Sequence, residues 1–245
     1  AFHSGGWSMA MEHGVFREKM YHYDLRSAYR WSACCGLPVL KSAKRVFDLE
    51  ADDSIFVVQF LPKDCPPWAV AGTGLITSEE VKALKIHPRL LFGVRFDKWY
   101  GFSDVFQRIE QAFPWCYKRI SRAFWGRWNG ETEVQQHGWK HGHRVRQLPN
   151  PLHNPIWSHF ITSRVKLRLL ETVKMVGGVH VQVDAVLCRD PLPLSDEPGG
   201  WQLKQEYSRG LFVDGTGRWG SGNILVKRMG LNVREAEQWQ RLKKS

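Results

Sequence analysis

The feature that most constrains the fold is a run of nine residues that alternates in the manner of a β-strand. The run extends from Val179 to Leu187 and is the strongest strand pattern in the chain. A period of two residues gives the strand one apolar and one polar face, as in a sheet that packs on a core. The two faces consist of His180, Gln182 and Asp184 on one side and Val179, Val181 and Val183 on the other.

Other segments of the chain show further strand and helix patterns. Strand patterns occur at 21–25, 54–61 and 90–96, and the stretch 63–74 has the Pro and Gly content of a loop. Helical patterns occur at 27–35, 78–84, 103–112, 114–125 and 156–175. The longest of these helices has an apolar face formed by Ile161, Val165, Leu169 and Val173.

Composition restricts the kind of protein and its partners. With 35 Lys and Arg against 24 Asp and Glu, the chain carries a formal charge of +11, which favours a polyanionic partner. No stretch approaches the roughly 20 apolar residues of a membrane span, and no signal-peptide pattern is present. The five cysteines form no CxxC pair, as is typical of reduced thiols. We therefore expect a globular cytoplasmic protein without a membrane partner.

The segment 129–155 loses all regular periodicity and collects His, Gly, Arg and Gln. This composition predicts a polar loop or hairpin that contacts a ligand. Its histidines, His137, His141 and His143, would suit a zinc site. No cysteine lies nearby, however, and the interleaved Lys and Arg residues would repel a cation, so contact with nucleic-acid phosphate is favoured.

Three segments, taken in their order along the chain, resemble the polymerase motifs of family B DNA polymerases, most closely the protein-primed type of bacteriophages. The first is 23–29, an aspartate on a strand followed by Ser-x-Tyr at fixed spacing. The second is 118–126, a lysine with an Asn-Ser-x-Tyr-Gly-like block on one helix, and the third is 182–184, which is similar to an Asp-Thr-Asp hairpin. The flanking stretches 2–7, 160–164 and 226–231 also match, so the resemblance covers almost the whole chain.

The resemblance implies an α+β fold, with a palm-like antiparallel sheet, packed helices and a short helical fingers element. In order, the expected parts are palm (1–102), fingers helices (103–128), polar loop or hairpin (129–155), second part of the palm (156–222) and a thumb-like or helical segment (223–245). An exonuclease domain and a full thumb have no room in this length. A protein partner is therefore expected to supply those functions.

Asp24 and Asp184 are the expected catalytic residues and metal ligands. Nucleotidyl transfer uses two divalent cations bridged by carboxylates, and two strands of one sheet can bring together residues 160 positions apart. Mg²⁺ is the expected ion, with Mn²⁺ as a substitute, because it accepts a few carboxylates together with phosphate and water. Taken singly, either aspartate would more often be a solvated or structural carboxylate.

Basic and aromatic residues supply the expected nucleotide and nucleic-acid contacts. Lys118 and Arg122 are spaced i, i+4, so one helix face would present two cations to a triphosphate. By resemblance, Tyr29 packs against the sugar and excludes a 2′-hydroxyl, while Trp125 stacks on the nascent base pair. The other candidates are Ser27, Arg108 and Arg119 for the nucleotide, and Lys140, Arg144, Arg146, Arg164 and Arg168 for nucleic acid. Core packing and helix solvation are the alternative roles for these aromatic and basic residues.

The sequence also departs from the family pattern. Gln182 replaces the first acid of the third motif, Arg30 replaces a proline, and the Lys-x-Tyr element expected near 217–219 lacks its lysine. The favoured function is template-directed addition of deoxynucleotides (dNTPs) to a primer on DNA. One alternative is a degenerate palm that binds nucleic acid or assembles a complex without catalysis. Another is a basic domain that binds nucleic acid through charge alone.

Overall fold

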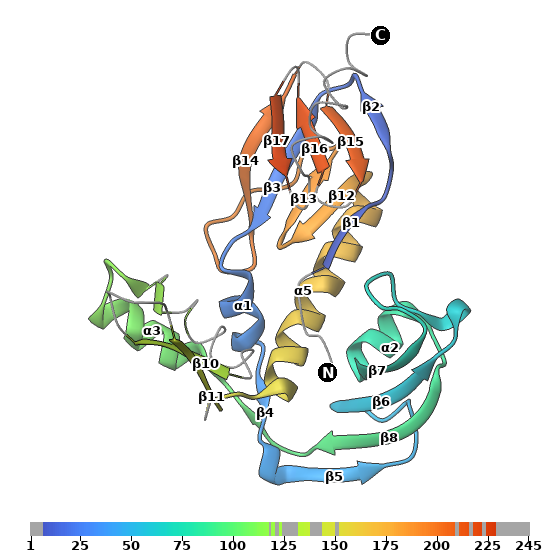
Figure 1. Cartoon of the computed structure of the whole chain (residues 1–245), viewed down its shortest axis with the longest axis vertical. Helices are drawn as coiled ribbons and strands as arrows, with labels where there is room; N and C mark the ends of the chain where they lie inside the picture. Colours follow the sequence, from blue (N-terminus) through green and yellow to red (C-terminus); the bar gives the residue numbers. More distant parts are fainter. Residues whose placement is uncertain are drawn as a thin grey trace. The chain divides into compact units, whose positions relative to one another are not determined.

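The computed structural model describes residues 7–117, 119–120, 123, 132–137, 144–149, 152–208, 211–215, 218–221 and 224–228. The chain divides into two compact units (Figure 1). The first contains residues 27–167, and the second contains residues 7–26 together with 168–228. In the part of the chain that is described, no helix is both long and apolar enough to cross a membrane.

A five-stranded antiparallel sheet forms the centre of the second unit. Its strands lie in the order β1-β12-β13-β3-β14. Strands from residues 7–25 are thus interleaved with strands from residues 178–207. The bounds are β1 (Trp7–Ala10), β12 (Gly178–Val183), β13 (Ala185–Cys188), β3 (Met20–Leu25) and β14 (Trp201–Tyr207). The antiparallel sheet confirms the predicted α+β class.

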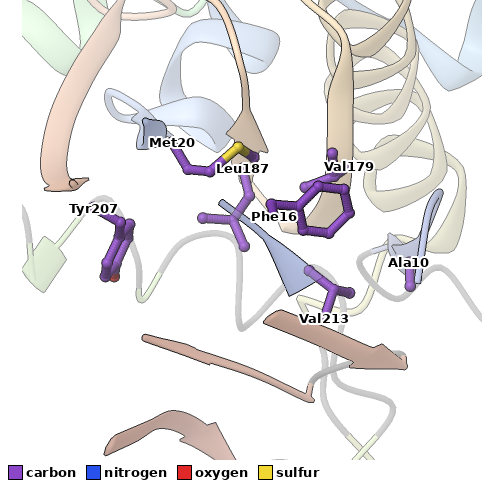
Figure 2. Close-up of a cluster of buried hydrophobic side chains, with 7 residues drawn as sticks. All are labelled: Ala10, Phe16, Met20, Val179, Leu187, Tyr207 and Val213. Atoms are coloured by element: carbon purple, nitrogen blue, oxygen red, sulfur yellow. The ribbon is translucent and has the colours of Figure 1, made fainter. Parts of the chain in front are cut away.

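A second, four-stranded sheet shares a core with this central sheet. Its order is β17-β16-β15-β2, with bounds Ile224–Arg228, Arg218–Ser221, Leu211–Gly215 and Gly14–Phe16 respectively. The shared core, drawn in Figure 2, consists of Ala10, Phe16, Met20, Val179, Leu187, Tyr207 and Val213. Because these side chains come from strands of both sheets, the two sheets fold as one body. Within the segment 223–245, which was expected to be thumb-like or helical, the described residues 224–228 form strand β17.

The long helix α5 (Pro155–Met175) confirms the longest helical pattern in the sequence. Asn154 begins it, because its side-chain Oδ1 accepts a hydrogen bond from the Trp157 N–H at 3.1 Å. Gly177, at φ +56°, follows its end in the left-handed conformation that glycine adopts most readily. The predicted apolar face is buried throughout: Ile161, Val165, Leu169 and Val173 are each at most 7% exposed.

The first unit is built around another four-stranded antiparallel sheet, ordered β5-β8-β6-β7. The strands are β5 (Ala43–Val46), β8 (Arg89–Phe96), β6 (Ser54–Phe60) and β7 (Gly72–Thr77). Helix α2 (Ser78–Leu84) packs on one face, over a cluster formed by Phe56, Val58, Phe60, Ile76 and Val81. Thr77 caps the start of this helix in a capping box. Its side chain accepts a hydrogen bond from the Glu80 N–H, and the Glu80 side chain accepts one from the Thr77 N–H.

Smaller elements complete the first unit. They are α1 (Ala28–Cys34), β4 (Leu37–Pro38), β9 (Trp99–Tyr100), α3 (Ser103–Ala112), β10 (Thr132–His137), β11 (Arg144–Pro149) and two 3-10 turns, Leu40–Ser42 and Pro62–Asp64. The antiparallel pairing of β10 with β11 shows that the predicted polar segment contains a hairpin. Arg30 joins α1 to α3 through a 2.8 Å ion pair with Glu110, which is a structural role for the residue that replaces the proline.

Two expectations differ from the structure. The single strand predicted over 179–187 is instead the pair β12 and β13, and the supposed polar side chains of His180 and Gln182 are 1% and 4% exposed. Their strand lies between β1 and β13 within the sheet, and every residue of β12 except Val183 is buried. Residues 27–102 belong to the same compact unit as residues 103–128, and the expected domain boundaries stay predictions.

Candidate catalytic site

The turn between β12 and β13 is a tight bend centred on Val183. The Asp184 N–H donates to the Gln182 carbonyl oxygen at 2.7 Å, which closes a γ-turn. Val183 has φ +59°, a conformation that a β-branched residue rarely adopts and that costs about 1–3 kcal/mol. The hairpin therefore holds Asp184 at its tip at a conformational cost, as is common at functional positions.

The register of the central sheet brings Asp24 and Asp184 to adjacent strands. Asp24 in β3 lies opposite Ala185 in β13, and the Leu25 N–H donates to the Asp184 carbonyl oxygen at 2.7 Å. Both residues are partly exposed, whereas Tyr23 and Leu25 beside Asp24 are 2% exposed. The two aspartates thus lie near the same end of the neighbouring strands β3 and β13. At this end their partly exposed side chains adjoin buried residues of the sheet.

Asp24 already has a lysine and a histidine as neighbours. Its Oδ2 lies 3.0 Å from Lys204 Nζ, and its Oδ1 lies 3.8 Å from His22 Nε2. Lys204 is brought there by an irregularity in β14, where the pairing with β3 shifts between Leu203 and Gln205. Lys204 could not be predicted from the sequence. The position of a bulge depends on how two strands pair, and the hydrophobic pattern of one strand does not indicate it.

The donor chemistry of Asp24 and Asp184 fits a magnesium ion. Mg²⁺ is usually held by one or two carboxylates and completes its octahedron with phosphate and water. Among the described residues, no group of three or more His, Cys, Asp and Glu side chains could hold a metal. The two aspartates would therefore act with oxygens from substrate and solvent, and a cation there would compete with Lys204 for Asp24 Oδ2.

The chain leaves β3 through a turn that is fixed on both sides. Arg26 donates its backbone N–H to Gly200 O at 2.8 Å, and its guanidinium pairs with Asp196 at 2.7 Å. Ser27 follows with φ +49°, a left-handed residue whose side chain does not cap α1. Tyr29, on α1, packs against the hydrophobic cluster that includes Phe106. The nucleotide roles of Ser27 and Tyr29 stay predictions.

Arg164 joins several elements of the first unit through its guanidinium, and its expected contact with nucleic acid stays a prediction. Its side chain is 10% exposed and makes a two-pronged ion pair with Glu79, with Nε 3.0 Å and Nη2 2.9 Å from Oε1. Its Nη1 donates to the carbonyl oxygens of Ser32 at 3.0 Å and Gly36 at 2.5 Å. These bonds engage all three nitrogens of the guanidinium and join α5 to α1 and α2.

We expect Arg164→Lys to lower the free energy of unfolding by about 2 kcal/mol, because an ammonium cannot reproduce the planar fork. Urea denaturation measures this. Arg168→Lys is the matched control, since the Arg168 side chain is 43% exposed and lies 4.0 Å from Glu171. A loss of DNA affinity in Arg164→Lys with unchanged stability would instead support the nucleic-acid role.

The remaining basic candidates differ in how much of their surroundings the structure describes. Arg108 and Arg119 are exposed in the first unit, and Arg168 is half-exposed on α5, so their roles stay predictions. Arg144 and Arg146 lie in β11, of which the backbone is described. Lys118, Arg122, Trp125 and Lys140 lie outside the described residues, as do His141 and His143 of the zinc alternative.

The strain at Val183 predicts an unusual response to glycine. Val183→Gly should change the unfolding free energy by less than about 1 kcal/mol, because relief of the left-handed strain offsets the lost side chain. Val181→Gly, in the same strand at 0% exposure, should cost about 2–4 kcal/mol. Equal losses in the two variants, measured by thermal or urea unfolding, would mean that the turn stores no strain.

Comparison with known proteins supports the fold. No protein-family model and no curated protein sequence matches the chain. Solved structures of phi29 DNA polymerase do match: its complex with primer-template DNA has a TM-score of 0.63 at 12% identity, covering 96% of this chain and 54% of that one. The complex with single-stranded DNA gives 0.63 at 10% identity, over 96% and 54% of the two chains. The ternary complex with incoming nucleotides gives 0.62 at 11% identity, over 96% and 55%. The chain thus spans about half the length of these polymerases and has a polymerase-like fold.

Proposed function

We propose that this chain is a DNA polymerase that adds deoxynucleotides to a primer 3′-hydroxyl under the direction of a template. One observation carries the proposal: Asp24 lies on β3 and Asp184 lies in the turn that leads into the adjacent strand β13, in a fold that is similar to a DNA polymerase. The three motifs in their order support a place in family B, in the protein-primed phage group, as part of this proposal.

Asp24 and Asp184 are the residues that would hold magnesium. When bound there, Mg²⁺ or Mn²⁺ activates the primer 3′-hydroxyl and offsets charge that develops on the transferred phosphate. The strained turn at Val183 keeps Asp184 in place, and the bonds of Arg26 to Gly200 and Asp196 fix the chain where it leaves Asp24. These contacts limit reorganisation during the reaction, which is how preorganised sites lower a barrier.

Other residues would bind the nucleotide and the DNA. Lys118 and Arg122 are proposed to contact the triphosphate, with Arg108 and Arg119 nearby in sequence, and Tyr29 and Ser27 to contact the sugar. Trp125 is proposed to stack on the new base pair. Lys140, Arg144, Arg146 and Arg168 are proposed to contact the DNA backbone. A protein partner that supplies exonuclease or thumb functions remains part of the proposal.

A catalytically degenerate palm is the second candidate, and two observations favour it. Gln182, where the family pattern has an acid, is buried at 4% exposure beside the strained turn. Asp24 pairs with Lys204 at 3.0 Å, an ion pair that is satisfied without any metal. A scaffold of this kind would bind DNA and need neither magnesium nor the Asp184 carboxylate.

Binding to primed DNA should weaken steeply with salt, because each neutralised phosphate releases condensed counterions. If three phosphates are neutralised, affinity should fall roughly 40-fold between 50 and 200 mM salt. Fluorescence anisotropy with a labelled primer-template measures the slope. A flat titration would contradict any role in which this chain, with its charge of +11, holds DNA.

Primer extension tests the proposed function. The purified chain is mixed with a labelled primer-template, four dNTPs and Mg²⁺ or Mn²⁺. Extension to the end of the template, with release of pyrophosphate, supports a polymerase. Tight, salt-sensitive binding without extension in either metal would favour the degenerate palm.

A further inference from the structure

The sheet β5-β8-β6-β7 of the first unit has one covered and one partly open face. Phe56, under α2, pairs with Gly93, and a Cβ on Gly93 would lie 2.8 Å from a Phe56 ring carbon. The next residues in the register, Val57 and Phe92, must point to the opposite face because strands alternate. Arg45 pairs with Val94, two residues from Phe92, and therefore shares this second face.

The second face carries two exposed aromatic rings around one guanidinium. Phe47, directly after β5, is 78% exposed, and Phe92 in β8 is 44% exposed. The Arg45 guanidinium lies 4.8 Å from the Phe47 ring centroid and 5.5 Å from that of Phe92. This group of three residues is called the Arg45 face below.

No carboxylate of the described residues offsets the charge on the Arg45 face. On the other side of the same strands, Lys44 and Arg95 both pair with Asp97. Arg45, in contrast, makes no ion pair with any described residue. Its guanidinium instead makes cation–π contacts with the rings of Phe47 and Phe92. An exposed cation between exposed rings favours an anionic, planar ligand over an apolar one.

We propose that the Arg45 face binds single-stranded nucleic acid, with bases stacking on Phe92 and Phe47 and the Arg45 guanidinium contacting a phosphate or a base. Single-strand binders combine these same parts: a positive charge that follows the backbone, and aromatic side chains on a sheet that stack successive bases. The stacking does not depend on base identity, because every base has a π-face.

Polar groups beside the rings extend the surface. Gln59, on β6, lies in the same alternating row as Val57, and its Oε1 accepts a hydrogen bond from Thr73 Oγ1 at 3.2 Å. The partner is anionic and aromatic, as a single DNA strand is. The inference rests on the proposed function only in identifying that strand as the unpaired template, since the binding itself needs no catalysis.

Binding of a fluorescein-labelled oligothymidine, measured by anisotropy at fixed low salt, tests the proposal. Each stacked base contributes about 1–3 kcal/mol by alanine substitution, which corresponds to roughly 5- to 150-fold in affinity. We expect Phe92→Ala to weaken binding at least about fivefold and the double variant Phe47→Ala/Phe92→Ala to weaken it further. Both rings are exposed, so urea unfolding should show that the variants fold.

Two control variants separate stacking from charge and from general apolar exposure. Val70→Ala removes an apolar side chain that is 83% exposed outside the Arg45 face, and it should bind as wild type does. Arg45→Lys keeps the charge but loses the planar group, so its affinity should fall between those of wild type and Arg45→Ala. Wild-type affinity in the folded double variant would overturn the proposal, and so would equal losses in Val70→Ala.

The outcome is independent of the primer-extension result. Loss of oligothymidine binding in the double variant, in a protein that extends no primer, would support the Arg45 face and contradict the polymerase function. Normal primer extension, together with unchanged oligothymidine affinity in the double variant, would support the polymerase function and contradict the Arg45 face. Binding of an acidic protein to the face, without any effect of the double variant on oligothymidine affinity, would also overturn the proposal.

Discussion

Replacing either Asp24 or Asp184 by asparagine should reduce primer extension by at least about 1,000-fold. The change removes one negative charge and leaves the side-chain volume almost unaltered. Loss of a ligand that supports charge stabilisation in the transition state costs several kcal/mol, and about 4 kcal/mol corresponds to a thousandfold in rate. The rate of single-nucleotide addition, measured in a quenched time course, gives the ratio directly.

Both variants should keep their affinity for primer-template DNA and their unfolding midpoint within a small margin. Asp190→Asn is the matched control, because Asp190 is exposed in the same unit, shortly after β13, and lies outside the proposed site. It should extend primers at the wild-type rate. Activity within tenfold of wild type in Asp24→Asn and Asp184→Asn would remove these residues from the catalytic site.

The second large effect concerns stability and the buried carboxylate of Glu80, which is 1% exposed. Its oxygens accept hydrogen bonds from the Thr77 N–H at 2.9 Å and from Trp68 Nε1 at 3.1 Å, and His159 Nε2 lies 3.5 Å away. Lys166, 5% exposed, adds an electrostatic attraction to the same group. Glu80 thus joins the start of α2 to the middle of α5.

Glu80→Ala should lower the free energy of unfolding by about 3–5 kcal/mol. Removing one partner of a buried charged pair leaves the other without compensation, here the Lys166 ammonium. The capping box at Thr77 is lost as well. Glu50→Ala, at an exposed position, is the control and should stay within about 0.5 kcal/mol of wild type. A loss below about 1 kcal/mol for Glu80→Ala, measured by urea denaturation, would show that the cluster is not a stabilising one.

The same cluster predicts how stability depends on pH. Burial alone would raise the pKa of Glu80, but the hydrogen bond and charge of His159, the Thr77 N–H and Lys166 outweigh it and hold the pKa below 4.5. A carboxyl with a lowered pKa stabilises the folded state above its unfolded pKa. This contribution is lost as pH falls through the lowered value, so acid should destabilise wild type more than Glu80→Gln.

The strand patterns, together with the resemblance to family B polymerases, predicted that Asp24 and Asp184 belong to neighbouring segments of one sheet, but not the turn that contains Asp184. Alternation through Val179–Leu187 indicated one strand, whereas the chain reverses at Val183. A two-residue hairpin turn is usually recognised by Asn or Gly, which tolerate positive φ. Valine gives no such signal, because the pairing on both sides of the turn imposes its conformation.

Features that depend on distant partners could not be predicted from local sequence. Arg164 and its partner Glu79 are 85 residues apart, so its helix position alone fitted solvation and phosphate contact equally well. Lys204 reaches Asp24 only because the pairing of β14 shifts beside it. The short strands β1 and β2 and the sheet of β15–β17 also lacked a pattern that was long enough to indicate a strand.

The most direct test of the central claim is single-nucleotide addition on four primer-templates that differ only in the first templating base. Each is offered each dNTP in turn, with Mg²⁺ or Mn²⁺, using wild type and Asp184→Asn. We expect wild type to add only the complementary nucleotide on each template and Asp184→Asn to add none. Addition that ignores the templating base, or equal addition by Asp184→Asn, would contradict a template-directed polymerase centred on Asp24 and Asp184.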